Sequence, residues 1–463
     1  MAETGGGRRV GVISLGCPKN LVDTEKMLGR FLDQGYTLTD DPEEADLLLV
    51  NTCGFKADAE AESREAILAM SAVKASHSGK RLVVTGCLAQ RHGAQLAQEM
   101  PEIDVLVGSD QYAELIPLIE ANQASGQAVL AVAPVVHSSP ALPEQAEPAR
   151  LLTTPAHTAY LKIAEGCNNP CAFCIIPQLR GRFRSRSMEA LVEEATQLGR
   201  QGVLEINLVS QDTTLYGRDL SPRVSLADLL RRLVAVEGIA WIRLLYLYPT
   251  LITPELLAVL AGEEKLLPYL DVPLQHSHSA VLQRMRRVER TPGIRRLLRQ
   301  IRRQLPQAVL RTTFIVGFPG ESKKEFRHLY RFVRRGWFDH VGVFTYSDEE
   351  GTAAFHLPDK VRPKTARKRQ KALMLLQQRI SRKKLRQWVG RTVPVLVEGL
   401  AEGYEDLWLG RSVGQAPEVD GLVYIHSGRA EPGKIIPVTI TGSHEYDLEG
   451  VPAQAVRRAK ARR

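Results

Sequence analysis

Cysteine is scarce in this chain of 463 residues, which has six in all, and a run of eighteen or more apolar residues is missing altogether. The missing run excludes a membrane-spanning helix, and residues 1–9 lack the apolar core of a signal peptide and form at most a short flexible arm. Few cysteines in a long chain without an export signal indicate metal or redox use rather than disulfides. We therefore expect a cytoplasmic protein with no membrane partner.

The six cysteines fall into two sets of three. The compact set lies in the run Glu165-Gly-Cys-Asn-Asn-Pro-Cys-Ala-Phe-Cys174, with the spacing C-x3-C-x2-C, and the dispersed set comprises Cys17, Cys53 and Cys87. Iron–sulfur clusters are held by cysteine thiolates. Three thiolates hold three corners of a four-iron cluster and leave the fourth iron open to another ligand. Two incomplete sets thus favour chemistry at iron over a purely structural metal site.

The compact set, Cys167, Cys171 and Cys174, indicates radical chemistry. The open iron of such a cluster can bind the amino and carboxylate groups of S-adenosylmethionine, and one electron then cleaves the carbon–sulfur bond to give a 5′-deoxyadenosyl radical. The alternative is a zinc site, which normally requires a fourth Cys or His at close spacing. Only His157 is near, and it precedes the adjoining strand.

Residues 8–124 are predicted to form a doubly wound α/β domain. Short apolar runs at 10–15, 46–50 and 82–85 alternate with helical patterns at 23–32 and 57–70, as in a parallel sheet. Cys17, Cys53 and Cys87 each follow one of these strands, where ligands gather in such sheets. A lone cysteine there is usually a small apolar residue, but three at equivalent positions favour a second cluster.

The rest of the chain is predicted to be a linker, a partial barrel and a small β-barrel. Residues 125–152 are proline-rich and aperiodic and indicate a linker. In the core, 153–383, six candidate strands lie at 160–164, 204–209, 241–246, 269–272, 310–316 and 341–345. Six strand–helix units are fewer than the eight of a closed barrel, so we expect an open (β/α)6 barrel. Residues 386–455 contain strands at 393–398, 407–411, 422–426 and 435–440 and indicate a small antiparallel β-barrel, followed by a basic tail at 456–463.

Polar and glycine residues at the ends of the barrel strands are candidate ligands for S-adenosylmethionine. These are Gln211, Asp212, Gln275 and Gly317. Catalytic and binding residues of barrels gather at these strand ends, although ordinary loop structure explains any one of them as well. The neighbouring His276 and His278 are interpreted as hydrogen-bonded loop histidines rather than proton carriers.

Positive charge is concentrated in two segments. Residues 281–303 carry nine Arg and one Glu, and residues 359–386 carry twelve Lys or Arg and one Asp, in a chain whose net charge is +9. A basic zone of this kind suits a polyanion such as ribosomal RNA. The alternative is a pair of helices with solvated basic outer faces.

The chain resembles the radical-SAM methylthiotransferase family over nearly its whole length. It has the same order of a three-cysteine domain, a C-x3-C-x2-C barrel and a TRAM-like β-barrel. Four segments are similar to the RimO-like branch: Leu15-Gly-Cys-Pro-Lys-Asn-Leu-Val-Asp23, Asn51-Thr-Cys-Gly-Phe55, Ile175-Ile-Pro-Gln-Leu-Arg-Gly-Arg182 and Ala416-Pro-Glu-Val-Asp-Gly421. The MiaB-like branch, which modifies an adenosine of tRNA, usually has the sequence Gly-Cys-Gln-Met-Asn in the first of these segments. Asn169-Pro170 departs from the basic pair often found there.

The resemblance implies that the six cysteines hold two 4Fe-4S clusters. It implies a methylthiotransferase that modifies the β-carbon of an aspartate in a small-subunit ribosomal protein, free or on the ribosome. The barrel cluster would reduce S-adenosylmethionine, and the N-terminal cluster would carry the sulfur. The sulfur and electron donors are not implied. Two alternatives remain open: methylthiolation of tRNA, and a non-catalytic, metal-stabilised RNA-binding protein.

Overall fold

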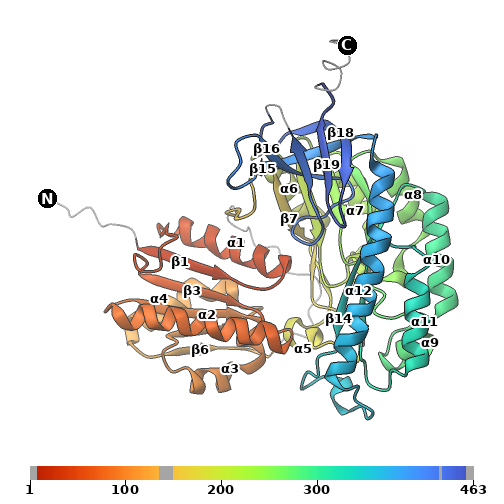
Figure 1. Cartoon of the computed structure of the whole chain (residues 1–463). Coiled ribbons are helices and arrows are strands. Elements are labelled where there is room, and N and C mark those ends of the chain that lie inside the picture. The colour runs from red at the N-terminus through yellow and green to blue at the C-terminus, as the bar shows by residue number, and fades with distance from the viewer. Residues whose placement is uncertain (1–7, 135–149, 427–429, 455–463) are drawn as a thin grey trace.

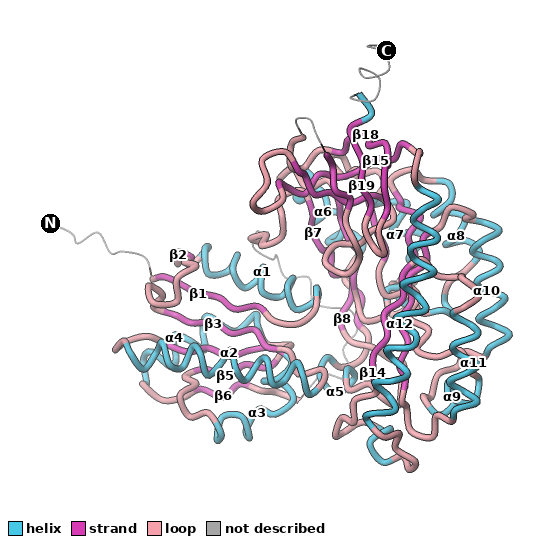
Figure 2. The backbone as a smooth tube through the Cα atoms, viewed as in Figure 1, coloured by secondary structure: helices cyan, strands magenta, loops and turns pink. Residues whose placement is uncertain are grey.

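The computed structural model describes residues 8–134, 150–426 and 430–454, which form three bodies in chain order (Figure 1). Residues 1–7 of the expected N-terminal arm and the basic tail at 456–463 lie outside these residues, and Arg9 already begins the first strand. An α/β domain comes first, a half-open barrel of strands and helices second, and a small β-barrel last (Figure 2). No helix in these ranges is long and apolar enough to cross a membrane.

The first domain is built on a six-stranded, wholly parallel sheet. Its strands are β1 (Arg9–Ser14), β2 (Thr37–Leu38), β3 (Leu47–Thr52), β4 (Arg81–Gly86), β5 (Val105–Gly108) and β6 (Val129–Ala131), in the order β2-β1-β3-β4-β5-β6. The predicted strands are β1, β3 and β4. Strand β6 falls within the range predicted to be a linker, which therefore starts later than expected.

Helices cover both faces of this sheet, which confirms the predicted doubly wound arrangement. Helices α1 (Pro18–Asp33) and α4 (Leu115–Ser125) pack on one face, and α2 (Ala57–Ser76) and α3 (Cys87–Glu99) on the other. Along β3, Leu47 and Leu49 point to the core under α1 and α4, and Leu48 and Val50 point to the core under α2 and α3. Because both faces are buried, the strand is an unbroken apolar run.

The central body is an open barrel of six parallel strands, as predicted. In spatial order from β14 to β7 they are β14 (His340–Thr345), β13 (Val309–Val316), β12 (Leu266–Asp271), β11 (Trp241–Leu244), β10 (Glu205–Val209) and β7 (Thr158–Lys162). The outer helices are α6 (Met188–Arg200), α7 (Leu226–Leu233), α8 (Pro254–Gly262), α10 (Thr291–Gln304), α11 (Lys323–Val333) and α12 (Pro363–Leu385), with the short α9 (Ser279–Arg284) before α10. A large apolar core fills the space between strands and helices.

The last body is a closed barrel of five strands. They are β15 (Thr392–Leu400), β16 (Leu407–Ser412), β17 (Val423–His426), β18 (Ile435–Ser443) and β19 (Leu448–Pro452). The pairs are antiparallel as predicted, except that β17 and β19 run parallel. Strand β19 was not predicted, because a glycine and a proline interrupt its apolar pattern.

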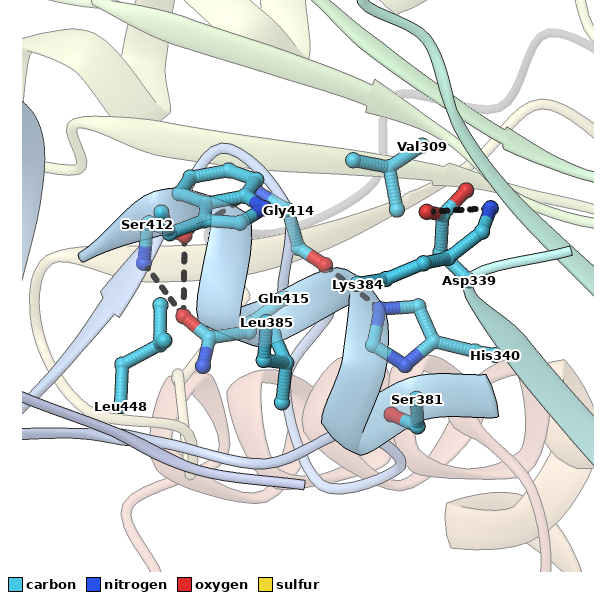
Figure 3. A pocket seen from close by; sticks show the side chains of 11 residues that line it. Val309, Asp339, His340, Ser381, Lys384, Leu385, Ser412, Gly414, Gln415 and Leu448 are labelled. Carbon is cyan, nitrogen blue, oxygen red and sulfur yellow. Dashed lines mark hydrogen bonds and ion pairs between the residues drawn. The ribbon is translucent and has the colours of Figure 1, made fainter. Parts of the chain in front are cut away.

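The C-terminal barrel is fixed to the end of the central barrel opposite the cysteine loop. His340, the first residue of β14, donates from Nε2 to the carbonyl of Gly414 at 2.8 Å, beside a small pocket at this junction (Figure 3). The carboxylate of Asp420 accepts from the Tyr269 hydroxyl at 2.6 Å and pairs with Arg311 at 2.5 Å inside the central barrel. The pocket in Figure 3 is therefore part of a domain contact.

Candidate active site

The dispersed cysteines meet at the carboxyl edge of the first sheet. Cys17 precedes α1 directly after β1, Cys53 follows β3, and Cys87 is the first residue of α3 after β4. Because β1, β3 and β4 are neighbours in the sheet, the three thiols come within electrostatic range of one another. The structure thus produces the convergence that the strand pattern predicts.

Glycine makes this convergence possible at two positions. Gly16 and Gly86 each precede a cysteine and have φ of 101° and 98°, a region that favours glycine. A Cβ on Gly16 would lie 3.1 Å from the sulfur of Cys53, and one on Gly86 would lie 2.5 Å from the carbonyl oxygen of Thr52. A larger residue would therefore separate the strand ends that carry the thiols.

The compact cysteines lie on one loop between β8 (Ala164–Glu165) and α5 (Ile176–Arg180). The backbone amide and the side-chain Nδ2 of Asn169 both donate to Cys167 Sγ at 3.4 Å. The same Nδ2 also donates to Asp212 at 2.8 Å, and Arg287 Nη1 lies 3.8 Å from Cys171 Sγ. Hydrogen bonds to the sulfurs are one means by which proteins set the potential of iron–sulfur clusters.

The donor chemistry of both sets fits iron–sulfur clusters. Burial raises the pKa of Cys53 and Cys167 to about 11 and that of Cys174 to about 12, so cluster assembly has to release protons from these thiols. Within residues 8–134, 150–426 and 430–454, no three His, Cys, Asp or Glu side chains could hold a single metal ion. Thiols that bind different irons of one cluster lie farther apart than the ligands of one ion.

One buried ion network joins the two cysteine sets. Arg180, at the end of α5, donates from Nε to Cys87 Sγ at 3.4 Å although Cys87 belongs to the other domain. Its Nη1 pairs with Asp23 of α1 at 2.7 Å and with Glu165 at 3.2 Å. Lys162 completes the network by pairing with Asp23 and, at 2.8 Å, with Glu165. Each charge is balanced by an opposite charge at the domain boundary.

Glu165 is held as a carboxylate in the centre of this network. Burial opposes its ionisation, but Lys162 and Arg180 together keep the pKa of Glu165 far below its usual range. Its Oε1 accepts from Gln211 Nε2 at 3.1 Å. A single carboxylate therefore connects the domain boundary to the end of β10 and to Cys167, two residues further along the chain.

The predicted strand-end residues divide into two pairs. Gln211 and Asp212 lie beside the compact cysteines, through Glu165 and Asn169 respectively, and burial raises the pKa of Asp212. Gln275 has a φ of 64° and exchanges backbone hydrogen bonds with β13. The amide of Gly317 donates to the carboxylate of Glu321 and is thus used within the protein.

The two histidines make contacts within the protein, and the amide of His278 donates to His276 Nδ1 at 2.9 Å, which agrees with the interpretation as hydrogen-bonded loop histidines. His276 is fully buried, with Nε2 3.5 Å from Glu321 Oε1. His278 caps α9 by accepting from the amide of Ala280. Both lie on the segment between β12 and α9.

Several residues of the site were not predicted. Asp23 and Arg180 are 157 positions apart, and Asp23 and Lys162 are 139 apart, so their pairing leaves no local pattern. Arg180 and Asp23 do lie within two of the segments that resemble the RimO-like branch. No sequence pattern marked Arg287 as part of the site, and Asn169 was marked only by its position between Cys167 and Cys171.

A parallel half-barrel with three closely spaced cysteines after its first strand defines a radical-SAM enzyme. The chain matches the Radical SAM superfamily over residues 161–333, the uncharacterized protein family UPF0004 over 9–108 and the TRAM domain over 389–452. The three matches correspond to the three bodies of the structure.

Curated relatives identify the family within this class. The chain is 47% identical over 437 residues to "Ribosomal protein uS12 methylthiotransferase RimO" of Myxococcus xanthus, covering 94% of this chain and 90% of the relative. It is 46% identical to the Geobacter sulfurreducens protein of the same name, covering 96% and 98%. The chain belongs to the RimO family of radical-SAM methylthiotransferases, and iron–sulfur binding and the use of S-adenosylmethionine follow from that membership.

Solved structures resemble the chain in fold. The radical S-adenosylmethionine methyltransferase TsrM of Kitasatospora setae, with cobalamin and a [4Fe-4S] cluster bound, matches with a TM-score of 0.53 at 16% identity, covering 73% of this chain and 75% of that one. The cobalamin-dependent radical enzyme OxsB, with aqua-cobalamin and S-adenosylmethionine bound, matches with a TM-score of 0.51 at 12% identity, covering 75% and 54%. At these identities the likeness concerns the fold alone.

Proposed function

We propose that this enzyme methylthiolates the β-carbon of an aspartate in ribosomal protein uS12, with one 4Fe-4S cluster on each cysteine set. The observation that carries the proposal is the ion network around Arg180, which touches Cys87 of one set and Glu165 beside the other. Two three-cysteine sets joined in this way suit a reaction that needs two iron centres at one substrate. The relatives' name supplies the protein substrate.

When bound, the barrel cluster would supply the electron that cleaves S-adenosylmethionine, and the N-terminal cluster would hold the sulfur to be transferred. The protein itself fixes positions. Asn169 and Asp212 orient the compact cysteine loop, and the Arg180 network holds the first domain against the barrel. An unactivated C–H bond is broken only by a reactive species, so orientation and exclusion of water at this boundary determine the yield.

The main alternative is methylthiolation of a tRNA adenosine. The two are separated by incubating the reconstituted enzyme with isolated uS12 and, separately, with tRNA, and by measuring the mass of each. We expect the methylthio mass on uS12 alone, and its appearance on tRNA alone would contradict the proposal. A non-catalytic RNA-binding protein is tested by metal analysis, for which about eight irons per chain are expected.

A basic outer surface supports contact with ribosomal RNA. Helices α10, α11 and α12 lie side by side on the outside of the barrel (Figure 1). They expose Arg296, Arg299, Arg303, Lys323, Lys324, Arg327, Arg331, Lys364, Arg367, Lys368, Lys371, Arg379, Arg382 and Lys383. Within these helices, as described from residue 291 to 385, the one acidic side chain is Glu325, which is paired with Arg284. Such a surface suits RNA phosphates and would hold the enzyme on the small subunit while uS12 is modified.

This contact predicts salt-dependent binding to small ribosomal subunits. Replacing Arg296, Arg299 and Arg303 by Glu should weaken binding and flatten its dependence on salt concentration, since fewer counterions are released. The matched control replaces three exposed arginines outside this surface, Arg200, Arg223 and Arg232, by Glu. Equal losses in both variants would contradict a specific role for the α10–α12 surface.

A further inference from the structure

Lys19 is a buried cation at the domain boundary. It lies in the first turn of α1, two residues after Cys17, and the residue is only 7% exposed. Its Nζ lies 3.7 Å from the centre of the Tyr246 ring, across the boundary. A buried ammonium is costly unless an anion compensates it, so the position requires an explanation.

Other buried cations nearby have carboxylate partners, whereas Lys19 does not. Lys162 pairs with Glu165 at 2.8 Å, and Arg287 pairs with Glu289 at 2.6 Å. Among the residues that the structure describes, no carboxylate comes within the 4.0 Å ion-pair distance of Lys19 Nζ. Cys17 and Glu165 are within electrostatic range of Lys19, but Cys17 is a proposed cluster ligand and Glu165 is already bound by Lys162 and Arg180.

Tyr246 places this cation at the mouth of the barrel. Tyr246 lies two residues after β11, its amide donates to Asp271 at 3.1 Å, and its carbonyl accepts from the amide of Thr213 at 3.1 Å. Thr213 follows Asp212, which holds Asn169 of the compact cysteine loop. Lys19 Nζ therefore lies between a residue of the dispersed set and the strand ends beside the compact set.

We propose that Lys19, packed on Tyr246, binds the side-chain carboxylate of the target aspartate. This inference rests on the proposed function and deepens it by naming a residue that binds the substrate. The β-carbon of aspartate is bonded directly to its carboxyl carbon. A carboxylate anchored on Lys19 thus places the reacting C–H bond between the two cysteine sets, and the incoming anion compensates the buried ammonium.

A second carboxylate, the methionyl group of S-adenosylmethionine, has the same chemistry. The two sources make different predictions for Lys19→Met. Loss of the aspartate anchor weakens binding of uS12 and leaves binding and cleavage of S-adenosylmethionine unchanged. Loss of a methionyl anchor has the opposite effect and would overturn the assignment.

The decisive experiment is a double-mutant cycle on the cluster-loaded full-length enzyme. The affinities of the wild type and of Lys19→Met are measured for uS12 and for uS12 with Asn in place of the target aspartate. The wild type should bind the aspartate form about 10- to 100-fold more tightly, as expected for a hydrogen bond between charged groups. Lys19→Met should bind the two forms equally, and Lys19→Arg, which retains the charge, should retain the preference.

Lys80→Met is the matched control, because Lys80 is a buried lysine of the same domain that donates to backbone carbonyls of Glu43 and Ala45. It should retain the full preference for aspartate. A preference that persists in Lys19→Met overturns the assignment, as does a variant that loses only iron, since Lys19 would then serve the cluster. A wild-type enzyme that binds neither form of uS12 contradicts the proposed function itself.

Discussion

The two cysteine sets have the same number of thiols but are built in different ways. The compact set lies within residues 167–174, and its own loop supplies the donor to Cys167 through Asn169. The dispersed set spans residues 17–87 and needs three neighbouring strand ends, together with Arg180 from the other domain. A local loop forms one site, whereas the other is assembled by the sheet of the first domain and is contacted at Cys87 by the second domain. Their sensitivities to substitution should differ accordingly.

The largest expected effect separates the roles of the two sets. Cys171→Ala should abolish cleavage of S-adenosylmethionine and with it all product. Cys53→Ala should leave cleavage intact but abolish sulfur insertion, because its cluster is proposed to hold the transferred sulfur. The measurements are release of 5′-deoxyadenosine and the mass of uS12, and about four irons should remain in each variant. Sulfur insertion by the Cys53→Ala variant would contradict the separate roles proposed for the two cysteine sets.

Arg180→Gln should damage the dispersed set and the domain contact. Removing Arg180 from the buried ion network leaves Asp23 and Glu165 with Lys162 as their shared cation, and the expected cost is about 3–5 kcal/mol of stability. Sulfur insertion should fall far more than cleavage of S-adenosylmethionine, a difference that general unfolding does not produce. Arg182→Gln, two residues away and exposed, is the control. Equal loss of both steps would make Arg180 merely structural.

Glu194→Gln tests whether domain contact alone maintains the dispersed set. Glu194 of α6 pairs with Arg150 at 2.7 Å, and Arg150 pairs with Glu25 of α1 at 3.1 Å. Burial opposes ionisation, but Arg186 and Arg150 lower the pKa of Glu194 to about 2. The folded-state pKa of Glu194 is thus below the ordinary glutamate value of 4.5, and its ionised side chain contributes about 3 kcal/mol to stability above pH 4.5.

This contribution is lost as the pH falls from about 4.5 towards 2. The thermal midpoints of the wild type and of Glu194→Gln should therefore differ most near pH 7 and approach each other in acid. At neutral pH the variant should keep the ratio of insertion to cleavage, because its contact is remote from the cysteines. A changed ratio would mean that any loosening of the domains disturbs the dispersed set.

The smallest effect is expected at Asn169. Asn169→Ala removes the side-chain bonds to Cys167 and Asp212 but leaves the backbone bond to the same sulfur. We expect a loss of about 1 kcal/mol, seen as a several-fold slower cleavage of S-adenosylmethionine with normal iron content. An unchanged rate would show that the loop backbone alone positions the thiols.

Much of the fold was predictable because buried parallel strands leave apolar runs in the sequence. All six barrel strands were found, with errors at their ends. Strand β12 begins at Leu266, earlier than predicted, because Pro268 within it argues against a strand. Strand β7 begins at Thr158, earlier than predicted, although threonine favours strands. Its hydroxyl hydrogen-bonds to Glu205 and Arg411, which are distant in the sequence.

The sequence by itself determined the three-body order, the two cysteine sets and the place of each cysteine after a strand. These features depend on residues close together in the chain, so strand periodicity and ligand spacing can be recognised in the sequence. The tertiary structure alone decided that Arg180 reaches Cys87, that Glu165 joins the two sets and that Lys19 faces Tyr246 without a carboxylate. Buried charges pair with residues of whichever segment packs against them. Because these segments are far apart in the chain, no local sequence pattern predicts the pairs.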